Sequence, residues 1–210
     1  MRQVLVTALV AAGMALPALA ENPPPFAWTQ ERFDLVAAAD SAAGSELAEK
    51  YRCAKCHNDT GVSDDPEIPT IAGQRATYMY KQLVDYRNEV RENRDMYKVA
   101  RKLSDEEMIH ISAWYEQQER PPKIGKDAPL VAKVCDSCHD KAKVEEDGYV
   151  EVAPILAGQI RPYLLATMLD FKQADRSNDL FDRMQSVTHK LTDNEIAVLA
   201  RYYGAAELPE

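Results

Sequence analysis

The chain has 210 residues, of which 34 are acidic and 25 are basic, and its formal net charge at pH 7 is −9. This length suits one large domain or two small ones. A surface this acidic argues against nucleic acid or an anionic membrane as a partner, because both carry negative charge. We therefore expect a protein partner with a basic docking patch.

Residues 1–20 have the pattern of a secretory signal. Arg2 is followed by an apolar run from Val4 to Leu16 and then by the small-residue site Ala18-Leu19-Ala20. The run is too short to span a bilayer comfortably, so we expect a cleaved signal peptide and a periplasmic mature protein without a transmembrane anchor. An uncleaved anchor is the alternative. Cleavage removes only Arg2 among the charged residues, which moves the net charge from −9 to −10.

The second half of the chain repeats the first. Each half carries Cys-x-x-Cys-His, then Pro-x-Ile/Leu-Ala-Gly-Gln, then a methionine seven residues before a leucine, and then Ser/Thr-Asp-x-Glu. The offset between the copies grows from 82 to 85 and then 88 residues, for the pairs Cys53/Cys135, Pro69/Pro154 and Met96/Met184. Because a period this long exceeds that of solenoid repeats, it indicates a duplicated domain.

This repeat predicts two domains, at residues 45–120 and 130–210, joined by a linker at 121–129. Residues 21–44 form an N-terminal extension to which we assign no function. Each unit has about 80 residues, and a core that small usually needs a covalent staple. Strands have little support, and we expect an all-α fold. Helices are predicted at 29–39, 45–51 and 78–93, and after capping boxes that begin at Ser104 and Thr192.

Each cysteine pair is followed at once by a histidine, which is the spacing of c-type haem attachment. Two thiols add to the two vinyl groups of one haem, and the adjacent imidazole then faces the iron. A redox Cys-x-x-Cys would need a βαβ context, and a zinc site would leave two adjacent histidines unexplained. We therefore expect two covalently bound haem c groups, attached through Cys53, Cys56, Cys135 and Cys138, with the iron ligands His57 and His139.

The second axial ligand of each iron is predicted to be a methionine. Met96 and Met184 are the only methionines that recur in register, and a thioether paired with histidine raises the haem potential. Met79, Met108 and Met168 lie within predicted helices, where methionine usually packs in the core. His110 and His189 are rival ligands, but neither is duplicated.

A histidine that binds iron is normally held by a hydrogen bond from its other ring nitrogen. The carbonyls of Pro69 and Pro154, which open the second repeated motif, are candidate acceptors. Gly73 and Gly158 in the same motif are expected to allow a positive φ angle or a close backbone approach.

Together these motifs resemble the dihaem cytochrome c4 family, from about Ser45 to Tyr203. The resemblance implies two class I cytochrome c folds about a pseudo-twofold axis, with axial pairs His57–Met96 and His139–Met184. Two features depart from the pattern. Lys143 replaces the glycine that the first copy has at Gly61, and the loop at residues 141–152 is highly charged.

The resemblance implies an electron carrier that shuttles between a dehydrogenase and a terminal oxidase or another acceptor, and not an enzyme. The second copy is also similar to the cytochrome subunit of flavocytochrome c sulfide dehydrogenases, so an electron-accepting subunit of a sulfur-compound dehydrogenase is the alternative. A dihaem peroxidase or thiosulfate dehydrogenase is a third possibility, which would require an open or labile iron position.

Overall fold

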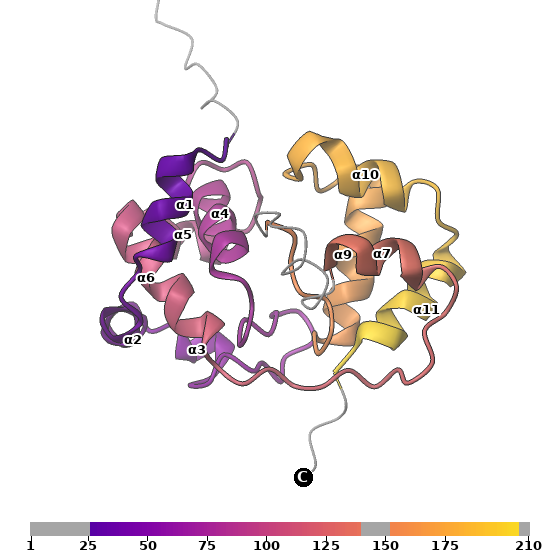
Figure 1. Cartoon of the computed structure of the whole chain (residues 1–210), viewed down its shortest axis with the longest axis horizontal. Helices are drawn as coiled ribbons and strands as arrows, with labels where there is room; N and C mark the ends of the chain where they lie inside the picture. The colour runs from indigo at the N-terminus through magenta and orange to yellow at the C-terminus, as the bar shows by residue number, and fades with distance from the viewer. Residues whose placement is uncertain (1–25, 140–151, 206–210) are drawn as a thin grey trace, which may run out of the picture.

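The computed structural model describes residues 26–139 and 152–205 and arranges them in two helical lobes that lie side by side (Figure 1). The first lobe contains helices α1 to α6, and the second contains α7 to α11. Within these residues the only β-type pairings are two isolated bridges, Lys123–Ala205 and Gln159–Gly204. The predicted signal peptide lies outside the described residues, and no helix inside them is long and apolar enough to cross a membrane.

Six helices build the first lobe, with the bounds α1 Gln30–Ala37, α2 Ser41–Lys50, α3 Ala54–His57, α4 Ala76–Arg87, α5 Arg94–Ala100 and α6 Asp105–Glu116. Helix α6 packs against both α2 and α4. The core between them is formed by buried aliphatic and aromatic side chains that include Tyr80, Val84, Met108, Ile111 and Tyr115. The predicted capping box holds the start of α6, because Ser104 and Glu107 exchange side chain-to-backbone hydrogen bonds.

The second lobe repeats this plan with α7 Ala132–His139, α9 Arg161–Gln173, the 3-10 turn η1 Leu180–Asp182, α10 Arg183–Thr188 and α11 Asp193–Tyr203. Helix α9 packs against α10 and α11. Its core contains Leu164, Met168, Ile196, Leu199 and Tyr203. The second capping box, between Thr192 and Glu195, is also present. The two predicted capping boxes are therefore confirmed.

The extension before the first domain packs onto that domain. Trp28 stacks on Phe33 with ring centroids 4.4 Å apart, and Phe26 meets Tyr80 edge-on at 5.8 Å. Thr29 caps α1 by accepting a hydrogen bond from the backbone of Arg32. The predicted helix at 29–39 is thus present, and aromatic contacts fix it to the first lobe.

Several helix boundaries and the placement of two methionines differ from expectation. Helix α2 begins at Ser41 rather than Ser45, because Asp40 accepts hydrogen bonds from the backbone of Ala42 and Ala43. Helix α4 runs from Ala76 to Arg87 rather than over 78–93, and Glu89 beyond its end has a φ of 58°. The sequence predicts no helix around Met96 or Met184, but Met96 lies in α5 and Met184 lies in α10.

Arg120 joins the two lobes at the end of the first domain. Its guanidinium donates to the Ala157 carbonyl at 2.6 Å, the Ala72 carbonyl at 2.8 Å and the Ile155 carbonyl at 3.1 Å. Ala72 and Ala157 are repeat equivalents, so one side chain bridges corresponding points of both copies. Burial lowers the pKa of Arg120 to about 10, and the side chain stays charged at neutral pH.

A second polar cluster lies deeper between the lobes. Lys81 of α4 donates to Asp85 and to the backbone carbonyl of Asn178, and the Asn178 amide also donates to Asp85. Nearby, Arg91 donates to the Tyr163 hydroxyl at 2.8 Å. Lys81 and Asp85 pair within α4, and each also bonds Asn178 of the second lobe, so separation of the lobes would remove hydrogen-bond partners from buried charged groups.

Candidate functional site

The first Cys-x-x-Cys-His motif forms a single helical turn. Cys53 precedes α3, and the backbone N–H of His57 donates to the carbonyl of Cys53 at 3.1 Å. Side chains three and four residues apart share a helix face. Cys53, Cys56 and His57 therefore project from one side of the turn, as attachment to one flat macrocycle requires.

The second motif lies at the end of the longer helix α7, where Cys135, Cys138 and His139 have the same spacing within continuous helix. None of the four cysteines forms a disulfide, and Cys53 and Cys135 are half-buried while Cys56 and Cys138 are exposed. Burial raises the pKa of the Cys53 and Cys135 thiols. Among the described residues, no group of three or more His, Cys, Asp or Glu side chains is arranged to hold a metal ion by itself.

Both motif histidines are buried and held by the predicted proline carbonyls. His57 Nδ1 lies 3.0 Å from the Pro69 oxygen, and His139 Nδ1 lies 2.7 Å from the Pro154 oxygen. Because a carbonyl can only accept, Nδ1 must carry the proton, which leaves Nε2 with its lone pair. Burial lowers the pKa of both histidines, and the proline carbonyls only partly oppose this shift. Each imidazole is therefore neutral at pH 7, the form that can ligate iron.

The two repeated methionines occupy similar places in the fold. Met96 lies in the first turn of α5, where its backbone N–H donates to the Asn93 side chain at 2.9 Å. Met184 lies in the first turn of α10, where its N–H donates to Asp179 at 2.6 Å. Both side chains are half-buried. Met96 packs against the same hydrophobic cluster as Cys53. No described contact joins either methionine to its histidine.

The rival histidines are placed elsewhere. His110 Nδ1 accepts a hydrogen bond from the backbone N–H of Asp40 at 3.1 Å, and its Nε2 lies 3.7 Å from Glu106. His189 is exposed at the end of α10. Met79, Met108 and Met168 are buried in the two hydrophobic cores, as expected for packing residues.

The turn glycines have the conformation that the sequence predicts. Gly73 has a φ of 60° and Gly158 a φ of 74°, both in the left-handed region. Their N–H groups donate, at 2.8 Å each, to the carbonyls of Tyr115 and Tyr203, which are also repeat equivalents. These bonds tie the turn after each proline to the last helix of its own domain.

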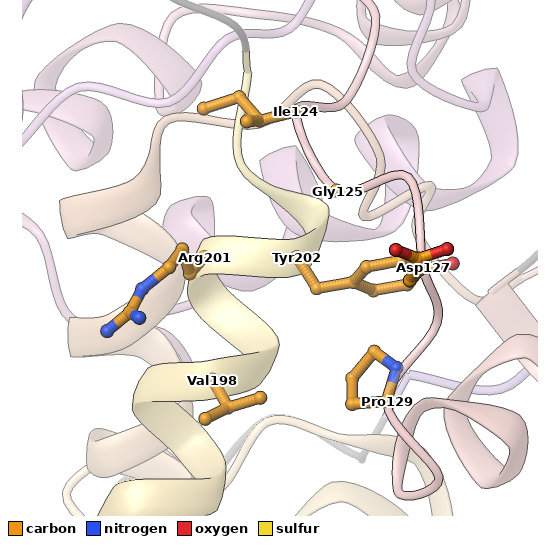
Figure 2. A pocket seen from close by; sticks show the side chains of 7 residues that line it. All are labelled: Ile124, Gly125, Asp127, Pro129, Val198, Arg201 and Tyr202. Carbon is orange, nitrogen blue, oxygen red and sulfur yellow. The ribbon is translucent and has the colours of Figure 1, made fainter.

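A separate pocket of about 280 Å³ lies between the linker and α11. Figure 2 shows Val198 and Tyr202 of α11 beside linker residues Asp127 and Pro129. The backbone N–H of Ile124 and of Gly125 donates to carbonyls of the last helix and its cap, which holds the linker there. The lining contains no cysteine or histidine, so this pocket is distinct from the candidate haem sites.

Comparison with known proteins decides the family. The Cytochrome c family model matches residues 41–119. Cytochrome c4 of Pseudomonas aeruginosa is 31% identical over 183 residues, which cover 79% of this chain and 88% of that protein. The chain belongs to the cytochrome c4 family. A thiosulfate dehydrogenase electron acceptor of Stutzerimonas stutzeri is 32% identical and covers 72% of this chain and 77% of its own length.

Solved structures agree with this assignment. The crystal structure of reduced recombinant cytochrome c4 from Pseudomonas stutzeri superposes with a TM-score of 0.63 at 25% identity, covering 81% of this chain and all of that one. The as-isolated thiosulfate dehydrogenase of Marichromatium purpuratum shares the fold, with a TM-score of 0.59. The predicted all-α fold of two tandem cytochrome c domains is confirmed, and so is the predicted cofactor, two covalently bound haem c groups.

The residues of this cytochrome c4 chain fit that cofactor. Each domain offers two thiols and a neutral imidazole from one helical turn, together with a repeated thioether. In addition, Arg176 Nη1 is buried and has no hydrogen-bond partner in the described part of the chain. A buried guanidinium N–H needs an acceptor, and a haem propionate is an acceptor of suitable charge.

Sequence reasoning missed the roles of Gln74 and Gln159. Each is the last residue of the repeated Pro-x-Ile/Leu-Ala-Gly-Gln motif, and the sequence predicts a role only for the prolines and glycines of that motif. Both are buried, and each makes hydrogen bonds to the opposite lobe. Their recurrence at the same offset of 85 residues was the available signal.

Proposed function

We propose that the mature chain is a periplasmic cytochrome that shuttles electrons between redox partner proteins by outer-sphere transfer and does not itself turn over a substrate. Its domains are residues 45–120 and 130–210, with a linker at 121–129. Residues 1–20 are a cleaved signal peptide, and residues 21–44 are an extension whose described part, residues 26–44, packs on the first domain. N-terminal sequencing of the mature protein should begin at Glu21.

The proposed attachment and ligand sets follow the repeat. Cys53 and Cys56 hold the first haem, and Cys135 and Cys138 hold the second. The iron ligands are His57 with Met96, and His139 with Met184. When bound, each haem supplies a one-electron iron couple. The protein residues fix the imidazole orientation, supply the neutral thioether and shelter the site from water.

The observation that carries the carrier role is the histidine–proline hydrogen bond, which occurs in both copies at 3.0 and 2.7 Å. It holds each imidazole in one tautomer with Nε2 available. A methionine recurs in register in each copy as the opposite ligand. If the histidine and the methionine of each copy both ligate its iron, no position would remain for a substrate to bind, and the haem would supply outer-sphere electron transfer.

Docking of the partner should be partly electrostatic because the chain carries a net charge of −9. Association with a basic partner should slow as salt rises, since screening shortens the range of surface charges. The functional test assays the purified protein alone with peroxide, sulfide and thiosulfate. It is then assayed as acceptor for a dehydrogenase and as donor to a terminal oxidase. Substantial turnover by the protein alone, with loss of a methionine ligand, would contradict the carrier role.

A second candidate function is the electron-accepting partner or subunit of a thiosulfate or other sulfur-compound dehydrogenase. Relatives from Stutzerimonas stutzeri and Thiomonas intermedia bear the name thiosulfate dehydrogenase electron acceptor. A permanent subunit would stay associated with the dehydrogenase at high salt, because large subunit interfaces are mainly apolar. Size-exclusion chromatography of the native protein from its host, at low and high salt, separates the two functions.

A further inference from the structure

The two domains are joined by a reciprocal pair of glutamines. The Gln74 side chain donates to the Ile155 carbonyl at 3.1 Å and accepts from the Ile155 N–H at 2.8 Å. In the other direction, the Gln159 side chain donates to the Thr70 carbonyl at 2.9 Å and accepts from the Thr70 N–H at 2.7 Å. The pairs Gln74/Gln159 and Thr70/Ile155 share the offset of 85 residues, so the two contacts are images of each other.

Each glutamine is also fixed from its own side. The Oε1 atom of Gln74 accepts a second hydrogen bond from the backbone of Arg75 at 3.0 Å, at the start of α4. Likewise, Gln159 Oε1 accepts from the backbone of Ile160 at 2.9 Å, at the start of α9. Only 4% of Gln74 and 5% of Gln159 is exposed. Two N–H donors at each Oε1 settle which end of the amide is oxygen, and burial strengthens both bonds.

Thr70 and Ile155, to which the glutamines hydrogen-bond, directly follow the prolines whose carbonyls accept from the histidines. The Thr70 N–H and the Pro69 carbonyl are the two ends of one planar peptide group. Gln159 accepts from that N–H, and His57 Nδ1 donates to that carbonyl at 3.0 Å. The peptide between Pro154 and Ile155 links Gln74 to His139 in the same way. Each histidine is therefore joined to the other domain by a hydrogen-bonded chain through one peptide group.

Such a chain is polarised along its length. A hydrogen bond accepted from a peptide N–H increases the negative charge on the carbonyl of the same group, and chains of this kind strengthen one another. The stronger acceptor pulls harder on the Nδ1 proton and makes the imidazole more basic. Because a more basic imidazole favours the oxidised iron, loss of the glutamine should raise the potential of the haem in the opposite domain.

We propose that Gln74 and Gln159 are positioning residues that act across the domain interface, Gln74 on His139 and Gln159 on His57. The proposal rests on the function proposed above, in which these histidines ligate the two irons. Each domain thereby sets the orientation and basicity of the axial histidine of its neighbour. Electron transfer through one haem then depends on docking of the other domain.

The test uses the full haem-loaded chain with Gln159→Met and Gln74→Met. These changes keep the side-chain length but remove the two hydrogen bonds to the other domain and the one to the next residue of the same domain. Two quantities are measured for each haem, namely the NMR signals of the axial histidine ring, including Nδ1–H, and the midpoint potential. Signals are assigned to each haem with Met96→Ala and Met184→Ala. Gln159→Met should move only the His57 signals. It should also raise the midpoint potential of the first haem, so that at a fixed solution potential the ratio of oxidised to reduced haem falls by up to about tenfold. Gln74→Met should do the same for His139 and the second haem.

Gln82→Met is the matched control for general damage at the interface. Gln82 is also buried, and it accepts hydrogen bonds from Arg91, Arg176 and Asn178, but it does not contact the peptide beside either proline. It should leave both sets of histidine ring signals in place. Equal shifts at both haems, shifts confined to the mutated domain, or no shift in a folded Gln159→Met protein would each overturn the proposal.

If the methionine variants do not fold, Gln159→Glu and Gln74→Glu replace them. A carboxylate has nearly the same size and is a stronger acceptor for the peptide N–H, although it cannot donate to the carbonyl that the glutamine amide binds. It should lower the potential of the opposite haem and leave the haem of its own domain unchanged. A shift in the mutated domain, or none, would again refute the inference. Failure of the proposed function looks different, because the unmodified protein would then lack two haems or show other axial ligands.

Discussion

The backbone of Gly158 lies against the carbonyl oxygen of Pro121, so closely that a β-carbon at position 158 would be 1.8 Å from that oxygen. Gly158 also has a φ of 74°. The contact joins the turn after Pro154 to the start of the linker, where the first domain ends. A glycine is therefore required at this point for two independent reasons, its backbone conformation and the close approach of a second backbone segment.

Gly158→Ala should lower the free energy of unfolding by about 2–4 kcal/mol. The left-handed conformation costs an alanine about 1–2 kcal/mol, and displacement of the linker backbone adds the rest. Gly204→Ala is the control and should lose less stability, since Gly204 has an ordinary φ of −54° and its β-carbon would lie 2.9 Å from the Ala200 carbonyl oxygen, a milder clash than at Gly158. Denaturant titrations followed by far-UV circular dichroism measure both. Equal losses in the two variants would contradict the prediction.

The mature protein should carry two haems per chain. Intact mass spectrometry should show an excess of two haems over the polypeptide, and the paired substitution Cys53→Ser/Cys56→Ser should reduce this excess to one. The equivalent change at Cys135 and Cys138 should also leave one haem, because each motif forms its own helical turn. An excess of one haem in the unmodified chain would show that only one motif is used.

Met96→Ala and Met184→Ala should each abolish the Met–iron absorption band of one haem and lower its potential by on the order of 0.1 V or more. Met79→Leu and Met168→Leu are the controls. Both methionines are buried in the cores, and replacing methionine by leucine changes the side-chain volume little. The control variants should keep both bands. The ligand assignment fails if His110→Ala or His189→Ala removes a band instead.

Acid should weaken the first capping box. The backbone N–H of Ser104, with help from Lys50 and Tyr51, lowers the pKa of Glu107 below its usual value. A carboxyl with a depressed pKa in the folded state contributes stability that is fully present above the unfolded pKa. That contribution is lost as pH falls through the folded value. Glu107→Gln should therefore lose stability relative to the parent at about pH 7, and the gap should close towards about pH 3.

Denaturant midpoints at both pH values test this prediction. Glu46→Gln on the exposed side of α2 is the control, and it should not reproduce the pH-dependent gap. If the parent and Glu107→Gln differ by the same amount at both pH values, the charge of Glu107 is not the source of the effect.

Local signals in the sequence predicted the parts of the site that depend on neighbouring residues. The sequence indicated the carbonyls of Pro69 and Pro154 as acceptors, and each of them accepts a hydrogen bond from the histidine of its own motif. Capping boxes located the starts of α6 and α11 because their hydrogen bonds span only three residues. The start of α2 was wrong by four residues, since the capping role of Asp40 was overlooked.

Contacts between the domains were not predicted. Arg120 binds carbonyls of Ala72 and Ala157, which are 48 and 37 residues away, and Gln159 reaches 89 residues back to Thr70. Hydrophobic periodicity reports which face of a helix is buried, but it does not report which polar side chain crosses an interface. The repeat indicates that two similar units exist. Their relative placement depends on hydrogen bonds from side chains to backbone, which do not affect the hydrophobic periodicity of the sequence.

The reciprocal glutamines also limit how far the two copies can diverge after duplication. A replacement at position 74 alters the second domain, and a replacement at position 159 alters the first, because each side chain bonds a backbone segment of the other copy. The sequence of neither copy can therefore change freely at these positions while the sequence of the other copy stays the same. Across related tandem cytochromes, a change at the position of Gln74 should be accompanied by change around Pro154 and Ile155 more often than around its own Pro69.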